Sequence, residues 1–387
     1  MTDHHAGSAW EFWIDRGGTF TDIVARRPDG TTAIHKLLSD NPEQYRDSAV
    51  QGIRDILGVE QTDKVPIEKI RAIKMGTTVA TNALLERKGE PTLLLTTKGF
   101  RDALRIGYQN RPDLFALNIE LPEQLYAAVQ EVAARITASG EVLVALDESG
   151  ARASLQKFYD QGLRSVAIAL MHGYRYHDHE IRLLELAQSI GFSQVSASHR
   201  VSPLMKFVSR GDTTVVDAYL SPILRRYVEQ ISSEFDGLAS HSGRLKFMQS
   251  NGGLTDARYF DGKDAILSGP AGGVVGMARV CEIAGFDRVI GFDMGGTSTD
   301  VSHYGGEFEK VFRANVAGVR IRAPMMLIHT VAAGGGSKLH FDGARYRVGP
   351  DSAGAHPGPA SYRNGGPLTV TDCNVMLGKL QPQLFPK

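Results

Sequence analysis

The spacing of apolar residues near the start of the chain predicts three short strands followed by a helix. The stretch "EFWIDRGGTFTDIVARRPDGTTAIHKLL", which begins at Glu11, contains strand-like runs separated by a Gly-Gly turn and a Pro-Asp-Gly turn. Asn41 and Pro42 then read as a helix cap and a first-turn proline, and apolar residues recur at helical spacing from Tyr45 to Leu57. The opening is therefore expected to be an antiparallel meander followed by a helix.

Strands and helices alternate after this point. "IRAIKMGTT" predicts a strand that runs into the helix "VATNALLERKG", and "PTLLLTT" predicts a buried strand. Three meander strands, helix, strand, helix, strand is the ribonuclease-H-like order found in each half of actin-type ATPases, which is an analogy of fold only. A long amphipathic helix is predicted from Thr213 to Phe235, with a kink or break at Pro222.

The opening meander recurs late in the chain. "DRVIGFDMGGTSTDVSHYGGEFE" repeats its strand–turn–strand pattern and the letters Asp-x-Gly-Gly-Thr-x-Thr-Asp. We therefore predict an α/β protein of the actin-like ATPase (ribonuclease-H-like) class, with duplicated domains and mixed sheets. The predicted domains are residues 1–205 and 206–387. The second half begins near Val289, and the residues after it are too few for a full copy, so we expect that half to be incomplete.

Composition narrows the class of protein. The chain has 387 residues with 42% hydrophobic and 22% charged residues, which suits a globular protein. Lys plus Arg and Asp plus Glu are both 43, so the overall charge does not suggest nucleic acid or an anionic membrane as a partner. Cys281 and Cys373 lack the paired spacing of a zinc or redox motif. The N-terminus does not resemble a signal peptide, and we expect a cytoplasmic protein.

The repeated motif has a chemistry of its own. Two glycines let the backbone approach a ligand, backbone N–H groups can point at phosphate oxygens, and the threonines add hydroxyl donors. A carboxylate at the strand end suits Mg²⁺ and not bare phosphate. One such hairpin is usually a simple turn, but two copies a domain apart favour a nucleotide site gripped from both sides. The predicted cofactors are ATP and Mg²⁺. The predicted catalytic and metal residues are Asp15 and Asp293, and the predicted nucleotide contacts are Gly17, Gly18, Thr19, Thr21, Gly295, Gly296, Thr297 and Thr299.

Other glycine-rich stretches allow two interpretations each. Gly334, Gly335 and Gly336 in "AAGGGS" are predicted to place N–H groups on the nucleotide. The stretch "SGPAGGVVG" from Ser268 either lines the predicted nucleotide site or packs the start of a helix tightly against a sheet, and both interpretations stay open. The stretch "GGGSK" from Gly334 to Lys338 has its serine and lysine in the wrong order for a P-loop, and no GxGxxG follows a strand. The histidines in "MHGYRYHDHE" are more typical of a surface or helix cap than of a metal site.

Several motifs together resemble the hydantoinase A/oxoprolinase family. They are "IDRGGTFTDIV", "MGTTVATNALLERKG", "ALMHGY", "SNGGL", "LSGPAGGVVG", "IGFDMGGTSTDVS", "TVAAGGGS" and "VGPDSAGAHPGPASYRNGGPLTVTDCNVMLG". The connecting stretches "KLLSDNPEQY", "IGYQNRPDLFALNI" and "LQPQLFPK" resemble the ATP-dependent 5-oxoprolinases of that family. The resemblance runs from about Trp13 to the last residue. Where relatives commonly carry Cys, this chain has Ser361, which places any thiol role there in doubt.

The resemblance implies hydrolysis of 5-oxo-L-proline to L-glutamate, with ATP phosphorylating the lactam oxygen and ADP and phosphate released. The substrate carboxylate would need a cationic partner, for which Arg101 and Arg111 are candidates. The implied partners are a small lactam and either a missing C-terminal portion or a hydantoinase B-like protein, and we expect a homo-oligomer. Two alternatives stay open. The first is an ATP-dependent hydantoinase or ketone carboxylase subunit, and the second is a nucleotide-binding remnant without catalysis.

Overall fold

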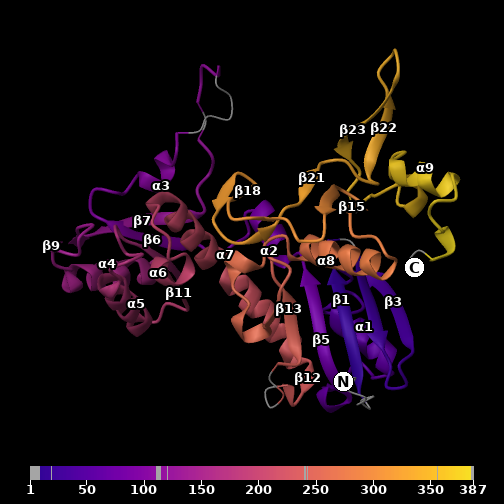
Figure 1. Ribbon diagram of the computed structural model, residues 1–387, viewed down its shortest axis with the longest axis horizontal. Coiled ribbons are helices and arrows are strands. Elements are labelled where there is room, and N and C mark those ends of the chain that lie inside the picture. The colour runs from indigo at the N-terminus through magenta and orange to yellow at the C-terminus, as the bar shows by residue number, and fades with distance from the viewer. Residues whose placement is uncertain are drawn as a thin grey trace.

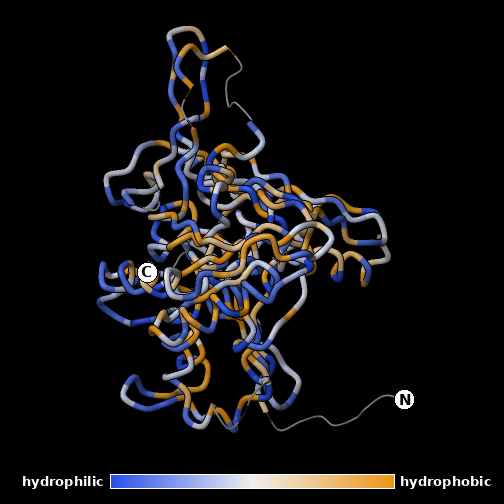
Figure 2. Tube along the Cα trace, turned by 90° about the vertical axis from the view of Figure 1, so that its left-hand side faces the viewer, coloured by the Kyte–Doolittle hydropathy of each residue, from blue (hydrophilic) through white to orange (hydrophobic). Residues whose placement is uncertain are grey.

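The protein is described from a computed structural model, which covers residues 9–18, 20–109, 115–119, 121–238, 241, 243–354 and 356–384. Within these residues the fold is α/β, and the three largest sheets have six, four and three strands (Figure 1). Hydrophobic segments of the trace gather in the middle of the molecule, as expected for a packed interior (Figure 2). No helix in the described part of the chain is long and apolar enough to cross a membrane.

The six-stranded sheet begins with the predicted meander, which the structure confirms. The strands lie in the order β14-β13-β5-β1-β2-β3. Their bounds are β1 (Trp10–Arg16), β2 (Phe20–Arg26), β3 (Thr32–Leu38), β5 (Ile70–Thr77), β13 (Leu245–Met248) and β14 (Leu254–Asp256). β1, β2 and β3 are antiparallel, while β5 is parallel to β1 and β13 is parallel to β5. The sheet thus takes strands from both sides of residue 205, and the predicted domain division stays a prediction.

Helix α1 (Ser48–Leu57) covers one face of the meander. Phe12 and Ile14 of β1 are buried against it, while the alternate residues Trp13 and Asp15 are exposed on the opposite face. The helix begins later than predicted from Asn41 and Pro42, because the Asp47 side chain accepts hydrogen bonds from the N–H groups of Ala49 and Val50 and caps it there.

The four-stranded sheet forms a separate lobe, at the left of Figure 1. Its strands are all parallel and lie in the order β11-β10-β6-β7. They are β6 (Thr92–Thr97), β7 (Tyr126–Val132), β10 (Ser165–Ala169) and β11 (Gln194–Ala197), accompanied by α3 (Ala103–Ile106), α4 (Glu148–Asp160), α5 (Asp178–Ile190) and α6 (Ser198–Val201). β6 and β10 are buried throughout, as the apolar run "PTLLLTT" predicts.

Helix α7 (Phe207–Ser233) is one continuous helix, so the break predicted as one possibility at Pro222 does not occur, and the alternative of a kink stays a prediction. A proline in a helix leaves the carbonyl four residues earlier without its N–H donor. Here that carbonyl belongs to Ala218, and the Ser165 hydroxyl of β10 donates to it at 2.7 Å. The neighbouring carbonyl of Tyr219 accepts a hydrogen bond from the Glu90 N–H. Tertiary donors therefore replace the bond that Pro222 removes.

Helix α8 (Ser268–Ile283) leads from the six-stranded sheet to the second meander, and Figure 1 shows it between the two. β15 (Val289–Met294), β16 (Thr299–Tyr304) and β21 (His329–Val331) form the three-stranded antiparallel sheet. The remaining elements are β4 (Val65–Pro66), α2 (Val79–Leu85), β8 (Arg135–Ile136), β9 (Val142–Val144), β12 (Phe235–Asp236), β17 (Lys310–Val311), β18 (Ala314–Val316), β19 (Val319–Ile321), β20 (Met325–Met326), β22 (Ser337–Phe341), β23 (Tyr346–Ser352) and α9 (Val370–Met376).

Candidate functional site

The first Gly-Gly-Thr hairpin joins β1 to β2. Asp15 lies near the end of β1, directly opposite Asp22 on β2 and Gly76 on β5. The Gly17 N–H donates to the Phe20 carbonyl at 3.0 Å and closes the turn. Gly18 is exposed at the tip of this turn. The hairpin therefore presents a carboxylate on one strand and open backbone at its tip.

The second hairpin, between β15 and β16, has the same construction. Asp293 lies opposite Asp300, and the Gly295 N–H donates to the Ser298 carbonyl at 2.9 Å. Gly296 and Thr297 are exposed at its tip. The repeat read from the sequence is thus confirmed down to strand register and turn closure.

The two hairpins face each other across the start of α8. A Cβ atom placed on Gly269 would lie 3.6 Å from Asp15 Oδ1, and one on Gly273 would lie 4.0 Å from Asp293 Oδ2. These glycines are four residues apart and so lie on the same face of the helix. Gly76 also borders Asp15, where an added Cβ would lie 3.4 Å from Oδ1. The open choice for "SGPAGG" is resolved in part, because Gly269 and Gly273 line the space beside the two carboxylates.

Asp15 has an environment that disfavours its charged form. It is accessible to solvent, yet the protein around it removes hydration, which is the main reason that its pKa is raised above the usual value. The negative charges of Asp22 and Asp293 raise the pKa further, and the positive charge of Lys36 opposes them. Asp22 and Asp293 therefore both repel the charged form of Asp15, and a cation bound beside Asp15 would relieve that repulsion.

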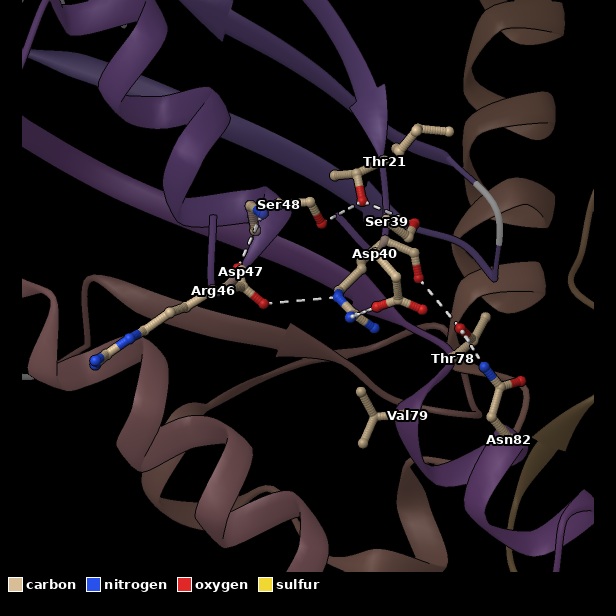
Figure 3. Close-up of polar contacts among 12 residues, drawn as sticks. Thr21, Ser39, Asp40, Arg46, Asp47, Ser48, Thr78, Val79 and Asn82 are labelled. Carbon is tan, nitrogen blue, oxygen red and sulfur yellow. Dashed lines mark hydrogen bonds and ion pairs between the residues drawn. The ribbon is translucent and has the colours of Figure 1, made fainter. Parts of the chain in front are cut away.

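A directed chain of hydroxyls supports the first hairpin from behind (Figure 3). The Ser39 hydroxyl donates to the Gly17 carbonyl at 2.7 Å, so its oxygen accepts from Thr21, 3.0 Å away. The Thr21 proton is then used, and the Ser48 hydroxyl donates to Thr21 at 2.7 Å. Thr21 and Ser48 are fully buried. The Thr21 hydroxyl is therefore committed to the protein, and contact with phosphate would require these bonds to break.

Arg16, the residue between Asp15 and Gly17, holds the same hairpin on its helix side. Its guanidinium lies 3.3 Å from Asp40, 3.6 Å from the capping residue Asp47, and over the ring of Tyr227. The Arg16 carbonyl accepts hydrogen bonds from both the N–H and the hydroxyl of Thr78 at the start of α2. These contacts fix the base of the hairpin to α1, α2 and α7.

The glycine loop before β22 supports the second hairpin. The N–H groups of Gly335 and Gly336 donate to the carbonyls of Gly295 and Gly296, and the Gly334 N–H donates to the Ser337 hydroxyl. In this structure the N–H groups of Gly335 and Gly336 hold the turn and that of Gly334 closes its own loop, so none of the three is presented to a ligand. The Thr299 hydroxyl likewise donates to the Ala333 carbonyl at 2.6 Å and is buried, as Thr21 is in the first hairpin.

The structure does not bring Arg101, one of the two predicted arginines, to the hairpins. Arg101 follows β6 in the four-stranded lobe, where its side chain donates to the Val129 carbonyl and lines a surface hollow with Arg105 and Tyr126. Figure 1 places β6 and α3 on the opposite side of the molecule from β1 and β15. The substrate-binding role predicted for Arg101 stays a prediction. Arg111 and Thr19 lie outside the described residues.

His177, from the histidine-rich stretch, makes contacts within the four-stranded lobe. His177 stacks on His199 with ring centres 5.2 Å apart, and His199 Nδ1 lies 2.8 Å from the buried carboxylate of Glu180. In the part of the chain that the structure describes, no group of three or more His, Cys, Asp or Glu side chains is arranged to hold a metal ion.

Sequence reasoning missed three charged residues beside the hairpins. Asp22 and Asp300 are the last letters of the two repeats, and they lie opposite Asp15 and Asp293 because a tight hairpin pairs residues equidistant from its turn. Lys36 pairs with Asp22 from β3. The repeated final Asp was a visible signal, whereas Lys36 depends on the register of a third strand.

The fold and site define an α/β protein with a duplicated Gly-Gly-Thr hairpin around paired carboxylates. Two family models match most of this chain. The hydantoinase/oxoprolinase N-terminal region matches residues 11–191, and hydantoinase/oxoprolinase matches residues 210–387. The chain belongs to the hydantoinase/oxoprolinase family.

Individual relatives agree with this assignment. The chain is 47% identical to 5-oxoprolinase 1 of Arabidopsis thaliana, in a match that covers 97% of this chain and 32% of that protein. It is 35% identical to caprolactamase subunit alpha of Pseudomonas jessenii, covering 95% of this chain and 54% of the subunit. The chain thus spans about a third of the length of the first relative and about half of the second.

Solved structures share the fold. The crystal structure of ATP-dependent caprolactamase from Pseudomonas jessenii matches with a TM-score of 0.77 and 32% identity, over 96% of this chain and 55% of that one. A nucleotide-free structure of acetone carboxylase matches with a TM-score of 0.76 over 97% of this chain and 55% of that one. At 24% identity the second match shows a shared fold alone.

Proposed function

We propose that this chain supplies the ATP-binding part of an enzyme that hydrolyses 5-oxo-L-proline to L-glutamate. The observation that carries the proposal is the pair of Asp-Gly-Gly-Thr hairpins that face each other beside the start of α8, in a chain 47% identical to a 5-oxoprolinase. The six-stranded sheet supports an actin-like ATPase fold, because β3-β2-β1-β5-β13 has the ribonuclease-H-like order, with two antiparallel strands followed by three parallel ones.

The residues present fit a magnesium nucleotide. Asp22 and Asp293 both repel Asp15, and carboxylate oxygens are the donors that Mg²⁺ prefers. Because Mg²⁺ usually keeps several waters and binds through one or two carboxylates plus phosphate oxygens, it does not need a cage of three protein ligands. Asp15 and Asp293 would hold the ion, and the hairpin tips at Gly18 and Gly296 would receive the phosphates.

Each part of the chain then has a defined task. ATP, when bound, supplies the phosphoryl group that turns the lactam oxygen into a leaving group. The hairpin tips orient the phosphates through backbone N–H groups, which act as fixed dipoles and cost no reorganisation during the reaction. Thr21, Thr299 and the Gly334–Gly336 loop keep the two tips in position from behind. This role replaces direct phosphate contact for these residues.

We also propose that a further polypeptide covers the second meander. Within the described residues β15 pairs with β16 alone, and Ile290 and Phe292 on its open face are 73% and 70% exposed. Ile283 and Phe286 at the end of α8 are exposed as well. Apolar surface of this kind usually marks a contact, and the caprolactamase relative is named as a subunit alpha. The homo-oligomer expected from the sequence stays a prediction.

The test is the rate of ADP release by the natural protein purified from its source organism. Candidate substrates are 5-oxo-L-proline, hydantoin and caprolactam, each added separately. The proposal predicts at least tenfold stimulation by 5-oxo-L-proline and one L-glutamate formed per ADP. Stimulation by hydantoin or caprolactam alone would assign the chain to another activity of the family. Nucleotide binding without stimulation by any of the three would indicate a non-catalytic remnant.

A further inference from the structure

The two hairpins match at the third strand as well as at the first two. In each sheet, the two motif carboxylates pair across the hairpin, and the second of them pairs with a residue on the next strand. The two rows are Asp15, Asp22 and Lys36 on β1, β2 and β3, and Asp293, Asp300 and Thr330 on β15, β16 and β21. The rows are therefore equivalent in register but differ in charge at the third position.

Lys36 neutralises part of the first row. Its ammonium lies 2.6 and 2.7 Å from the two carboxylate oxygens of Asp22, and its charge also favours the ionised form of Asp15. When both carboxylates are ionised, the ammonium leaves this row with one net negative charge. A lysine has three N–H donors, so Lys36 can hold Asp22 and still donate to a phosphate oxygen.

The second row has no such cation. Thr330 donates its neutral hydroxyl to Asp300 at 2.7 Å. Among the described residues, neither Asp293 nor Asp300 forms an ion pair with a Lys, Arg or His side chain. Two carboxylates and a hydroxyl leave this row at −2. Because like charges opposite each other on paired strands destabilise a sheet, the second row gains more from a bound cation than the first.

We propose that Lys36 makes the two hairpins unequal, so that the Asp293–Asp300 hairpin takes the cation of the magnesium nucleotide and the Asp15 hairpin takes phosphate through Lys36. The inference rests on the proposed nucleotide site and refines it: the ion placed there between Asp15 and Asp293 is assigned to Asp293 with Asp300, and the first hairpin is assigned to phosphate. A bound ammonium at the first row repels a second cation, since both would compete for the same carboxylates. The same ammonium attracts the polyphosphate that a bare pair of carboxylates would repel.

The register offers a matched exchange of residues as the test. Lys36→Thr removes the ammonium from the first row, and Thr330→Lys adds one to the second. Both positions are exposed strand residues, so folding can be confirmed by circular dichroism. Lys246→Thr, on β13 of the same six-stranded sheet, is the control for a change of one charge elsewhere. The probe is Mn²⁺ in place of Mg²⁺, measured by electron paramagnetic resonance with a non-hydrolysable ATP analogue.

The proposal predicts that Thr330→Lys weakens Mn²⁺ binding at least tenfold. Lys36→Thr should keep or strengthen Mn²⁺ binding and weaken the metal-free binding of the analogue at least fivefold, while Lys246→Thr matches wild type in both. Wild-type Mn²⁺ affinity in folded Thr330→Lys, or loss of Mn²⁺ binding in Lys36→Thr, would overturn the assignment. If the wild type binds neither Mn²⁺ nor the analogue, the proposed nucleotide site itself fails and this inference falls with it.

Discussion

Replacing Thr21 by Val tests which of two roles the Thr21 hydroxyl has. It either stabilises the first hairpin from within the protein or contacts the ligand directly. Valine keeps the shape of threonine and removes the hydroxyl. Two hydrogen bonds are lost, at 3.0 Å to Ser39 and at 2.7 Å from Ser48, and the fully buried Ser48 hydroxyl loses its acceptor. At about 1 kcal/mol net per bond, with an added penalty for a stranded buried donor, the expected loss of unfolding free energy is about 2 to 3 kcal/mol.

Urea denaturation followed by tryptophan fluorescence suits this measurement. The chain has two tryptophans, Trp10 and Trp13, and both lie on β1, so the signal reports the sheet that carries the hairpin. Thr21→Ser is the matched variant, because it keeps the hydroxyl and loses one buried methyl group, for about 1 kcal/mol. If Thr21→Val left the urea midpoint unchanged but weakened nucleotide binding, the hydroxyl would contact the ligand directly and the supporting role would be refuted.

Three further predictions concern other parts of the account. Gly334→Ala would place a Cβ 2.7 and 2.8 Å from backbone oxygens of the second hairpin turn. We therefore expect a loss of about 1 to 3 kcal/mol in unfolding free energy, together with weaker nucleotide binding. Wild-type values for both quantities would contradict the packing argument. Ser165→Ala should lower the unfolding free energy by about 1 to 2 kcal/mol, because the Ala218 carbonyl loses its donor. This loss should be smaller when Pro222→Ala restores a backbone N–H to the helix. Equal losses with and without Pro222→Ala would disprove the explanation. Burial raises the pKa of Asp217 to about 6. The contribution of the protonated Asp217 to stability is therefore full below about pH 4 and is lost as the pH rises through 6. Asp217→Asn should flatten this part of the plot of unfolding free energy against pH by about 1 to 3 kcal/mol, and an unchanged plot would contradict the prediction.

Local patterns in the sequence predicted much of the first sheet and the repeat. Period-two alternation around a Gly-Gly turn is a short-range signal, so the meander could be read from about 30 neighbouring letters. The final Asp of each repeat was equally visible, but its place opposite Asp15 or Asp293 follows only once the hairpin register is fixed.

The support of the hairpins could not be predicted in the same way. Thr21 reaches Ser39 and Ser48, which are 18 and 27 residues away, and no local pattern joins them. The continuity of α7 at Pro222 could not be predicted for the same reason, because the replacement donor Ser165 lies 53 residues before the carbonyl to which it donates. Residues that act through the backbone of a distant loop, such as Gly335 and Gly336, carry the same glycine signal whether they bind a ligand or a neighbouring turn.

The central claim is that both hairpins bind one magnesium nucleotide between them. Calorimetric titration of a non-hydrolysable ATP analogue with Mg²⁺ into the wild type and into an Asp15→Asn, Asp293→Asn double variant tests it most directly, since asparagine keeps the volume of each side chain and removes its charge. The account predicts one nucleotide bound per wild-type chain and at least a tenfold loss of affinity in the folded double variant. Equal affinity in the two proteins would contradict it.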